Sequence, residues 1–376
     1  ETRKPRNGDL LFTVTGSYGI PVLIDSDDKF CFQRHIAIVR PCTISNRYLY
    51  VILGSSYVKS ICDAKATGTA QKTVGLATLR ELLIPVAPYK EQMQIYAQTQ
   101  DALSIVDSVS SDKEDLLNII ESAKTKILDL AIRGQLVPQD PTDEPASVLL
   151  ERIRAEKEEL IKQGKIKRDK KESVIFRGED NSYYEKMADG KLHCLDNQLP
   201  FELPDGWEWC NLSMIGTTNI GLTYRPTDIE PGGIMVLRSC NIVNDQFDLS
   251  DLVRVKTTVR ENQFAQKNDI LICARNGSRS LVGKCALIPD LREPASFGAF
   301  MAIYRTEYFE FIVHYLRSSF FRSVFDDSNS TAINQLTQDM LKRAIVPLPP
   351  LSEQRRIVEA IGAMLFELNQ IEKSLS

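Results

Sequence analysis

The sequence predicts an α+β fold in which two tandem units, each with a mixed sheet and helices, are connected to long helices. Three observations predict it. An apolar segment, expected to be a strand that ends at prolines, runs into a long heptad-patterned helix twice, at residues 84–115 and from residue 346 onward. Short strand and helix motifs recur at a nearly constant offset. The length of 376 residues allows two or three domains, each with its own core.

Both long helices are expected to begin after prolines, at Glu91-Gln92 and at Glu353-Gln354. Proline suits the first turn of a helix, and a glutamate there is stabilised by the helix dipole. Spacings of four and three then alternate along both helices, which is the 3.5-residue repeat of a coiled-coil seam. The predicted seam positions are Ile95, Thr99, Ala102, Val106, Val109, Lys113, Leu116, Ile120, Ala123, Ile127 and Leu130 in the first helix, and Ile357, Ile361, Met364, Leu368, Ile371 and Leu375 in the second.

Single amphipathic helices more often cover a local core than form a coiled coil. Two copies in matching register favour the coiled coil, and the simplest partner for each helix is the other one. At 1.5 Å per residue, the first helix is roughly 65 Å long.

The two units repeat each other in order along the chain. Residues 8–11 match 268–271, 36–40 match 301–305, 53–57 match 316–320, and 68–70 match 330–332. The offset changes only from 260 to 265, which predicts a tandem duplication. In the first unit, the pattern predicts strands near 10–15, 20–24 and 36–40, then a helical stretch over 48–64.

The predicted organisation has five parts. They are a first unit at 1–88, a long helix at 89–135, a connector with a charged helix at 136–200, a second unit at 201–350, and a second long helix at 351–376. Residues 180–198 of the connector are expected to form an exposed loop. The second unit has about 65 residues before its first repeated motif and the first unit has seven, so we expect the chain to be incomplete at both ends.

Composition excludes several classes of function. The eight cysteines include no C-x-x-C pair and the three histidines are scattered, which argues against a zinc site and indicates reduced cysteines in the cytoplasm. No apolar run has membrane length. The net charge is −4, but residues 1–80 carry 11 basic and 6 acidic side chains, which leaves nucleic-acid binding open. A basic run over 162–171 is either a solvated surface or a phosphate contact.

Three short segments resemble catalytic motifs, but each lacks residues that the chemistry requires. Gly283-Lys284-Cys285 resembles the end of a phosphate loop, but cysteine replaces the hydroxyl that magnesium requires, so a turn between strands is predicted. Pro349-Pro350 lacks the flanking residues of an amino-methyltransferase motif, and Asp27-Asp28 has no partner carboxylate at a spacing typical of a nuclease.

Polar loops at equivalent places in the two units remain. Residues 275–280 of the second unit carry arginines suited to guanine edges and an amide suited to adenine, on a glycine turn. The counterpart at residues 15–18 differs in every specific side chain. One framework with different loops is what two readers of different base sequences need.

The whole pattern resembles the specificity subunit of type I restriction-modification systems. The repeated Pro-x-x-Pro-x-x-Glu-Gln helix start, the connector from Leu128 to Gln139 and the segment Leu203-Pro204-Asp205-Gly206-Trp207 carry the likeness. The resemblance implies two target recognition domains that read the halves of a split DNA target, separated by an antiparallel coiled coil. It also implies a non-catalytic chain that binds double-stranded DNA, methyltransferase subunits, expected as two, and restriction subunits. S-adenosylmethionine, ATP and magnesium are expected on those partners, with no cofactor or metal on this chain and no membrane.

The residues predicted to contact DNA are chosen by their place in loops. They are Ser17, Tyr18, Arg34, Thr69, Gln71, Lys72, Arg238, Asn241, Arg275, Asn276, Ser278 and Arg279. Two alternatives remain open. In the first, the chain is a coiled-coil scaffold whose β-rich modules bind something other than DNA. In the second, it is the targeting part of a single-chain restriction methyltransferase.

Overall fold

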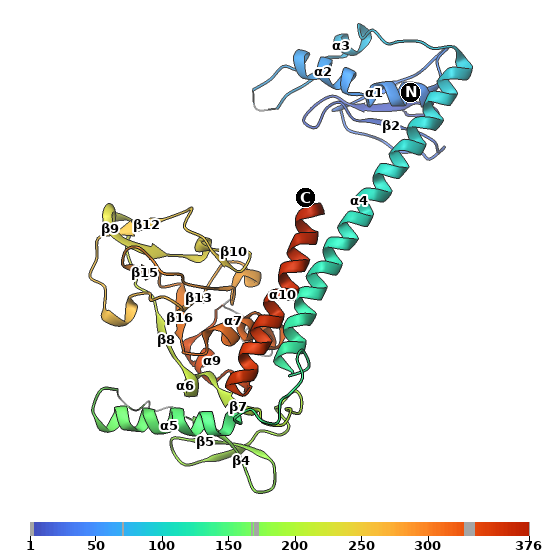
Figure 1. Cartoon of the computed structure of the whole chain (residues 1–376). Coiled ribbons are helices and arrows are strands. Elements are labelled where there is room, and N and C mark those ends of the chain that lie inside the picture. The colour runs from blue at the N-terminus through green and yellow to red at the C-terminus, as the bar shows by residue number, and fades with distance from the viewer. Residues whose placement is uncertain (1–3, 70, 167, 169–172, 327–334, 376) are drawn as a thin grey trace. The chain divides into compact units, whose positions relative to one another are not determined.

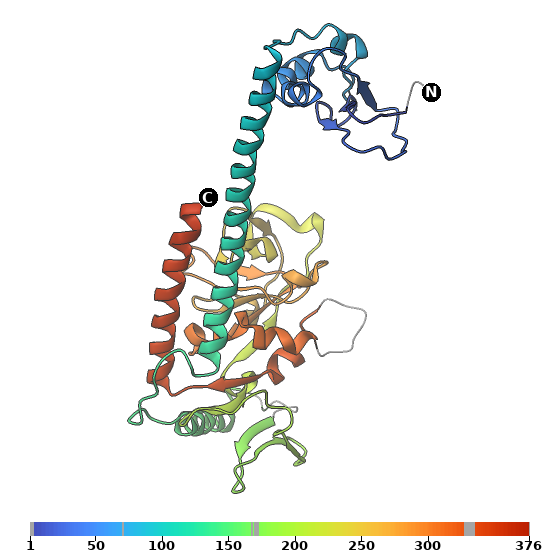
Figure 2. The same ribbon diagram turned by 90° about the vertical axis from the view of Figure 1, so that its right-hand side faces the viewer.

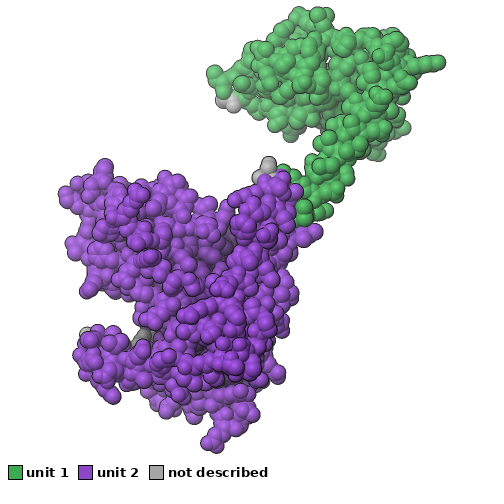
Figure 3. All heavy atoms as spheres, viewed as in Figure 1, with its two compact units in different colours: residues 1–116 green, residues 117–376 purple. Residues whose placement is uncertain are grey.

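The computed structural model describes residues 4–69, 71–166, 168, 173–326 and 335–375. The chain forms two compact units, Glu1–Leu116 and Leu117–Ser376 (Figure 3). The division falls inside one helix, α4 (Tyr89–Ile132). Each unit therefore consists of a folded domain and one part of that helix.

Unit 1 is built on an antiparallel sheet in the order β2-β1-β3 (Figure 1). Helices cover it, and its core includes Leu10, Phe12 and Val58. The predicted helical stretch over 48–64 is two helices, because the Ser55 side chain accepts a hydrogen bond from the Val58 backbone and caps a second helix. The elements are β1 (Leu10–Thr13), β2 (Pro21–Leu23), β3 (Ile36–Val39), α1 (Asn46–Leu53), α2 (Ser56–Lys65) and α3 (Leu76–Arg80).

Unit 2 repeats this sheet in the order β14-β13-β16, with β8 added beyond β16. The repeated elements are β13 (Ile270–Cys273), β14 (Cys285–Leu287), β16 (Met301–Arg305), α7 (Phe309–Arg317), α8 (Ser319–Asp326) and α9 (Gln338–Arg343). The predicted duplication is confirmed by this shared topology, except that its 330–332 part lies outside the described residues. Gly283 lies in a turn before β14, as predicted.

The duplication extends to single hydrogen bonds. In unit 1, the Asp9 carboxylate accepts from Arg40 Nε and Nη2, at 2.8 and 2.7 Å, and from the Arg6 backbone at 2.9 Å. In unit 2, the Asp269 carboxylate accepts from Arg305 Nε and Nη2, at 2.6 and 2.7 Å, and from the Gln266 backbone at 2.8 Å. We call each set the Asp–Arg clasp.

Unit 2 adds segments that have no repeat among the described residues of unit 1. They are β7 (Glu208–Asn211), α6 (Leu212–Ile215), β8 (Thr217–Ile220), β9 (Ile229–Leu237), β10 (Ile242–Val243), β11 (Gln246–Phe247), β12 (Val253–Val255), β15 (Ala295–Phe297) and β17 (Ile345–Leu348). β9 pairs with β12 and β15, and β17 pairs with β7. The apolar segment before each long helix was expected to be a strand. Only β17 is one, because residues 84–87 have no strand to pair with in the described part of unit 1.

The connector holds a helix, α5 (Ala146–Lys162), as predicted. The expectation of an exposed loop over 180–198 is wrong. β5 (Tyr183–Met187) and β6 (Leu192–Cys194) form a sheet with β4 (Ser173–Arg177). Ile175 and Leu195 are buried against Trp209, so this small sheet gains a hydrophobic face that its polar sequence does not display.

α10 (Leu351–Leu375) lies alongside the last part of α4 in the opposite direction (Figures 1 and 2). Lys124 Nζ of α4 lies 2.7 Å from Glu372 Oε2 of α10. The antiparallel pairing is confirmed, but seven seam positions are wrong. Five of them lie in α4 before its pair with Glu372, and their side chains are exposed: Ala102, Val106, Val109, Lys113 and Leu116. The other two lie in α10. Met364 and Ile371 are 42% and 44% exposed, while Leu365 and Leu368 are partly buried. An α-helix has 3.6 residues per turn, so a strict 3.5-residue seam drifts around it.

The junction where α4 ends and α10 begins is closed by the Trp207 side chain. Its indole nitrogen donates to Glu353 Oε2 at 3.0 Å, and Gln139 Nε2 donates to Glu353 Oε1 at 3.2 Å. Gly134 ends α4 with φ +68°, and a Cβ there would lie 2.5 Å from Pro204. Glycine is required by both the conformation and the close approach.

Breaking one clasp tests its contribution to stability. Asp269→Asn leaves the Arg305 guanidinium without its carboxylate, so we expect a loss of about 3 kcal/mol of unfolding free energy, the lower end for buried pairs because Arg305 reaches solvent. Asp290→Asn, at an exposed pair with Lys267 3.8 Å long, is the control, with a loss below about 0.5 kcal/mol. Urea unfolding measures both. Equal losses would show that the clasp adds nothing specific.

Candidate nucleic-acid interface

Three segments of unit 2 converge where β13 ends. The Ala274 and Arg275 backbone nitrogens both donate to the Phe300 carbonyl, at 2.9 and 3.0 Å. On the other side, Leu336 N donates to the Ala274 carbonyl at 2.7 Å, and Arg275 forms a bridge with Gln335. The loop that follows β13 is therefore held from two sides at its base.

The side chains of this loop divide into those that hold it and those that face solvent. The Asn276 side-chain oxygen accepts from the Ser278 backbone at 3.0 Å, and the Ser278 and Ser280 hydroxyls are 2.8 Å apart. Arg275, Ser278 and Arg279 are exposed. Asn276 therefore shapes the turn, and the two arginines present the cationic groups of the loop.

The Arg275 guanidinium lies over the Phe300 ring, 5.5 Å from its centroid. No carboxylate pairs with Arg275 in the described part of the chain. Phe300 was not among the predicted residues. A phenylalanine beside a strand is normally interpreted as a core residue, so its sequence alone does not indicate a contact. The one signal is the offset of 265 that aligns β3 with β16, because it places Phe300 opposite His35 of unit 1.

Arg238 and Asn241 were predicted to contact DNA, and the structure uses both internally. Asn241 is fully buried: its oxygen accepts from the Arg238 backbone at 2.8 Å, and its nitrogen donates to the carbonyls of Asp248 and Asp251 at 2.8 and 2.9 Å. Arg238 Nη2 donates to Asp251 Oδ1 at 2.7 Å. Both amide hydrogens of Asn241 are used and its side chain is not exposed, so we remove it from the interface and assign it to loop stability.

Unit 1 brings most of its predicted residues to the equivalent end of its sheet. Thr15 bridges Thr73, as Arg275 bridges Gln335, and Gly16 N donates to the Lys72 carbonyl at 3.0 Å. The exposed predicted residues here are Ser17, Thr69, Gln71 and Lys72. Val14 N donates to the His35 carbonyl at 2.9 Å, which places the exposed Arg34 next to this group.

Tyr18 is the exception in unit 1. It is 8% exposed, its hydroxyl donates to Asp63 Oδ1 at 2.8 Å, and Lys59 Nζ lies 4.1 Å from the centre of its ring. The hydrogen bond to Asp63 raises the pKa of Tyr18. Its role is to anchor the turn over 16–19 to α2, and we remove it from the predicted contacts.

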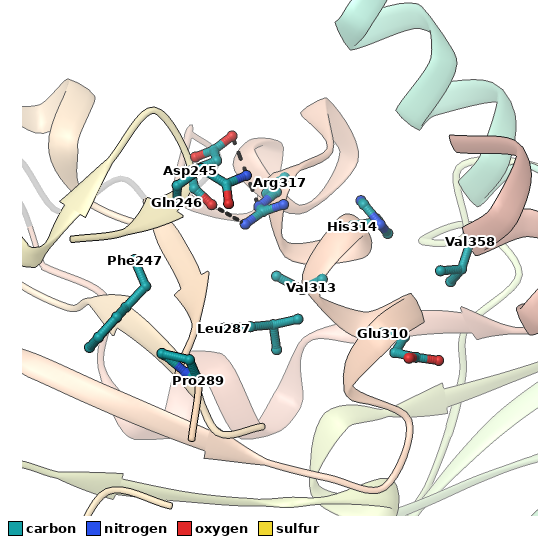
Figure 4. Close-up of a pocket in the computed structure, with 10 residues that line it drawn as sticks. All are labelled: Asp245, Gln246, Phe247, Leu287, Pro289, Glu310, Val313, His314, Arg317 and Val358. Carbon is teal, nitrogen blue, oxygen red and sulfur yellow. Dashed lines mark hydrogen bonds and ion pairs between the residues drawn. The ribbon is translucent and has the colours of Figure 1, made fainter. Parts of the chain in front are cut away.

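A hollow of about 500 Å³ lies between the β10–β11 hairpin, α7 and α10 (Figure 4). Arg317 of α7 crosses it: its Nη2 donates to the carbonyls of Asp245 and Cys285, and its Nε lies 3.9 Å from the Asp245 carboxylate. His314 lies one turn earlier, and its Nδ1 has no hydrogen-bond partner among the described residues. Burial and the Arg317 charge lower the pKa of His314 to about 3, so it is neutral near pH 7.

Other features of the described residues carry no chemistry. No group of three His, Cys, Asp or Glu side chains there has the arrangement of a metal site. All eight cysteines are free. No helix in the described ranges is both long and apolar enough to cross a membrane. In the basic run, Lys167, Lys170 and Lys171 lie outside the described residues, and Arg168 pairs with Glu158 at 2.5 Å.

Comparison with known proteins bears directly on this arrangement. Residues 204–375 match the family model described as the type I restriction modification DNA specificity domain. The chain is 31% identical over 389 residues to the type I restriction enzyme EcoAI specificity subunit of Escherichia coli, with 90% of this chain aligned. Residues 204–375 therefore carry the specificity domain of type I restriction-modification systems, and the chain is similar to the specificity subunits of these systems. The EcoEI specificity subunit, also from Escherichia coli, is 29% identical over 292 residues, or 75% of this chain.

The chain spans 63% of the length of the EcoAI subunit and 45% of the EcoEI subunit. Solved structures support the fold. The HsdS subunit from Thermoanaerobacter tengcongensis has a TM-score of 0.53 at 17% identity, covering 100% of this chain and 78% of that one. A chain from a study of complex assembly and conformational transition of the type I R-M system has a TM-score of 0.61 at 17% identity, covering 99% and 77%. The predicted two-domain α+β fold with spacer helices is confirmed.

His314 predicts a pH dependence of stability. Its pKa is lower in the folded chain than the ordinary value near 6.5, so below that pH the unfolded chain binds a proton that the folded chain does not. The contribution of neutral His314 to the free energy of unfolding is complete above about pH 6.5. It is lost as the pH falls toward 3, by up to about 1.4 kcal/mol per pH unit. Urea unfolding at several pH values, with His314→Leu as comparison, should show a shallower acid slope in the variant. Identical slopes would contradict a neutral, partly buried His314.

Proposed function

We propose that this chain is the DNA-recognition part of a type I restriction-modification complex. In this role it binds a bipartite double-stranded target and has no catalytic activity of its own. One observation carries the proposal: in both units the equivalent strand begins at the same clasp and ends in a loop held by the same bridge, yet the exposed side chains differ. Constant framework with variable loops is typical of paired recognition modules.

The exposed groups suit base edges and phosphates. In unit 2, Arg275 supplies a fork that matches the O6 and N7 atoms of guanine, Arg279 supplies charge for a phosphate, and Ser278 accepts or donates. In unit 1, Gln71 matches an adenine edge, Lys72 and Arg34 match phosphates, and Ser17 and Thr69 add hydroxyls. We keep these eight residues as the proposed DNA contacts.

Arg238 and Asn276 belong to the support of the interface in this proposal. Asp251 already balances the charge of Arg238, and Asn276 caps its own loop. Both side chains fix the loops from which the contacting residues project. Such support still affects recognition, because a loop that is free to move holds its base contacts poorly.

Partner subunits supply the chemistry in this proposal. Methyltransferase subunits, two per complex, bring S-adenosylmethionine, and restriction subunits bring ATP and magnesium, all in the cytoplasm. α4 has 44 residues and α10 has 25, and their paired part is proposed as the spacer that sets the gap between the two half-sites. The relatives named above are specificity subunits of type I restriction enzymes, which supports this assignment.

The experiment is to co-express the complete specificity polypeptide with its methyltransferase subunits and to map adenine methylation in the host genome. A split target sequence, methylated only when this chain is present, is the expected result. Methylation without sequence preference, or none, would refute the proposed function.

Salt dependence provides a second measurement on the same complex. Log affinity for DNA should fall by about 0.9 per phosphate contact for each tenfold rise in salt. Arg279→Ala should reduce that slope by about one contact. The control is Arg254→Ala, at an arginine of unit 2 that is not among the proposed DNA contacts. A slope near zero in the wild type would favour a scaffold that binds something other than DNA.

A further inference from the structure

Phe300 stands out because it is a large apolar side chain left in solvent. It lies at the turn between β15 and β16 and is 61% exposed, whereas Phe297, three residues earlier, is fully buried. Exposing an aromatic ring forgoes the stabilisation that burial provides. A stable domain that leaves this ring outside its core has it available for contact with a partner.

The backbone that carries the ring is held in place by hydrogen bonds. The Phe300 carbonyl accepts two hydrogen bonds from residues 274 and 275, and Met301 N donates to the Gly298 carbonyl at 2.8 Å to close the turn. The Arg275 guanidinium lies over the ring at 5.5 Å. An aromatic face and a cation are therefore presented together, on a backbone whose hydrogen bonds are already formed.

Unit 1 shows that this position is one of the places where the two units differ. The His35 carbonyl accepts from Val14 N at 2.9 Å, as the Phe300 carbonyl accepts from Ala274 N at 2.9 Å. His35 and Thr15 therefore stand where Phe300 and Arg275 stand. The backbone contact is the same, and both exposed groups are replaced.

We infer that Phe300 is a specificity-determining residue of unit 2. Its ring makes apolar contact with the bases next to the one whose edge Arg275 reads. His35 is the counterpart in unit 1. Such a ring distinguishes sequences in one of two ways. It makes apolar contact with a thymine methyl group, or it inserts between the bases of a flexible step. The inference rests on the proposed function and goes beyond it by naming an uncharged reader.

The test uses the complete specificity polypeptide assembled with its methyltransferase subunits. Binding is measured on the cognate duplex and on duplexes randomised in either half-site, at several salt concentrations. Phe300→Ala should reduce the ratio of cognate to non-cognate affinity about tenfold, within the range for one base contact, and only for one half-site. Because no charge is lost, the salt slope should stay as in the wild type. Phe176→Ala, at a 37% exposed phenylalanine on β4, is the control and should change neither quantity.

Arg275→Ala and the double variant extend the test. If ring and cation act as one reader, the double variant loses less than the sum of the two single losses. Phe300→Leu, which keeps an apolar side chain, should retain part of the discrimination.

Two results would overturn the inference while leaving the proposed function intact. One is a Phe300→Ala complex with the wild-type preference. The other is a Phe300→Ala complex with affinity lowered equally for every sequence, which marks a structural or protein-contacting ring. A wild-type complex without any sequence preference would remove both the proposed function and this inference.

Discussion

The Asp–Arg clasp is the interaction that fixes the strand from which each loop of the proposed interface begins. A carboxylate that is almost fully buried, such as Asp269 at 1% exposure, must have its charge balanced and its lone pairs occupied. Arg305 does the first with two parallel donors, and the Gln266 backbone nitrogen adds a third. These bonds tie the turn before β13 to the end of β16. The strand is thereby fixed in register, and the loop at its other end has a defined origin.

This arrangement lets the loops vary without cost to the domain. Backbone groups alone close the loop base, through the carbonyls of Phe300 and Ala274 in unit 2 and of His35 in unit 1. Side chains at these positions take no part in those bonds. Arginine can therefore replace threonine, and phenylalanine can replace histidine, while the same backbone contacts persist. The variable groups sit outside the hydrogen-bond network that stabilises the sheet.

The repeated strands and long helices could be predicted from the sequence, because a pattern that occurs in both copies rarely arises by chance. The strands around residues 8–11 and 268–271 and both long helices follow from it. Single residues were less predictable. Tyr18 and Asn241 are polar residues in loops, yet their burial depends on Asp63 and on the carbonyls of Asp248 and Asp251, which no local pattern indicates. The β5–β6 hairpin was missed because Tyr183 and Leu195 pack on residues from a different part of the chain.

The helix pair shows why a correct heptad pattern still misplaces individual contacts. Ile357 and Ile361 are buried among Leu128, Ala131 and Ile132, where the domain core holds α10 against α4. Beyond that core the seam follows the true turn of the helix, so Glu372 rather than Ile371 faces Lys124. Two of the apolar side chains that the pattern placed in the seam, Met364 and Ile371, are exposed instead. The surface of the helix pair thus differs from that of an ideal coiled coil.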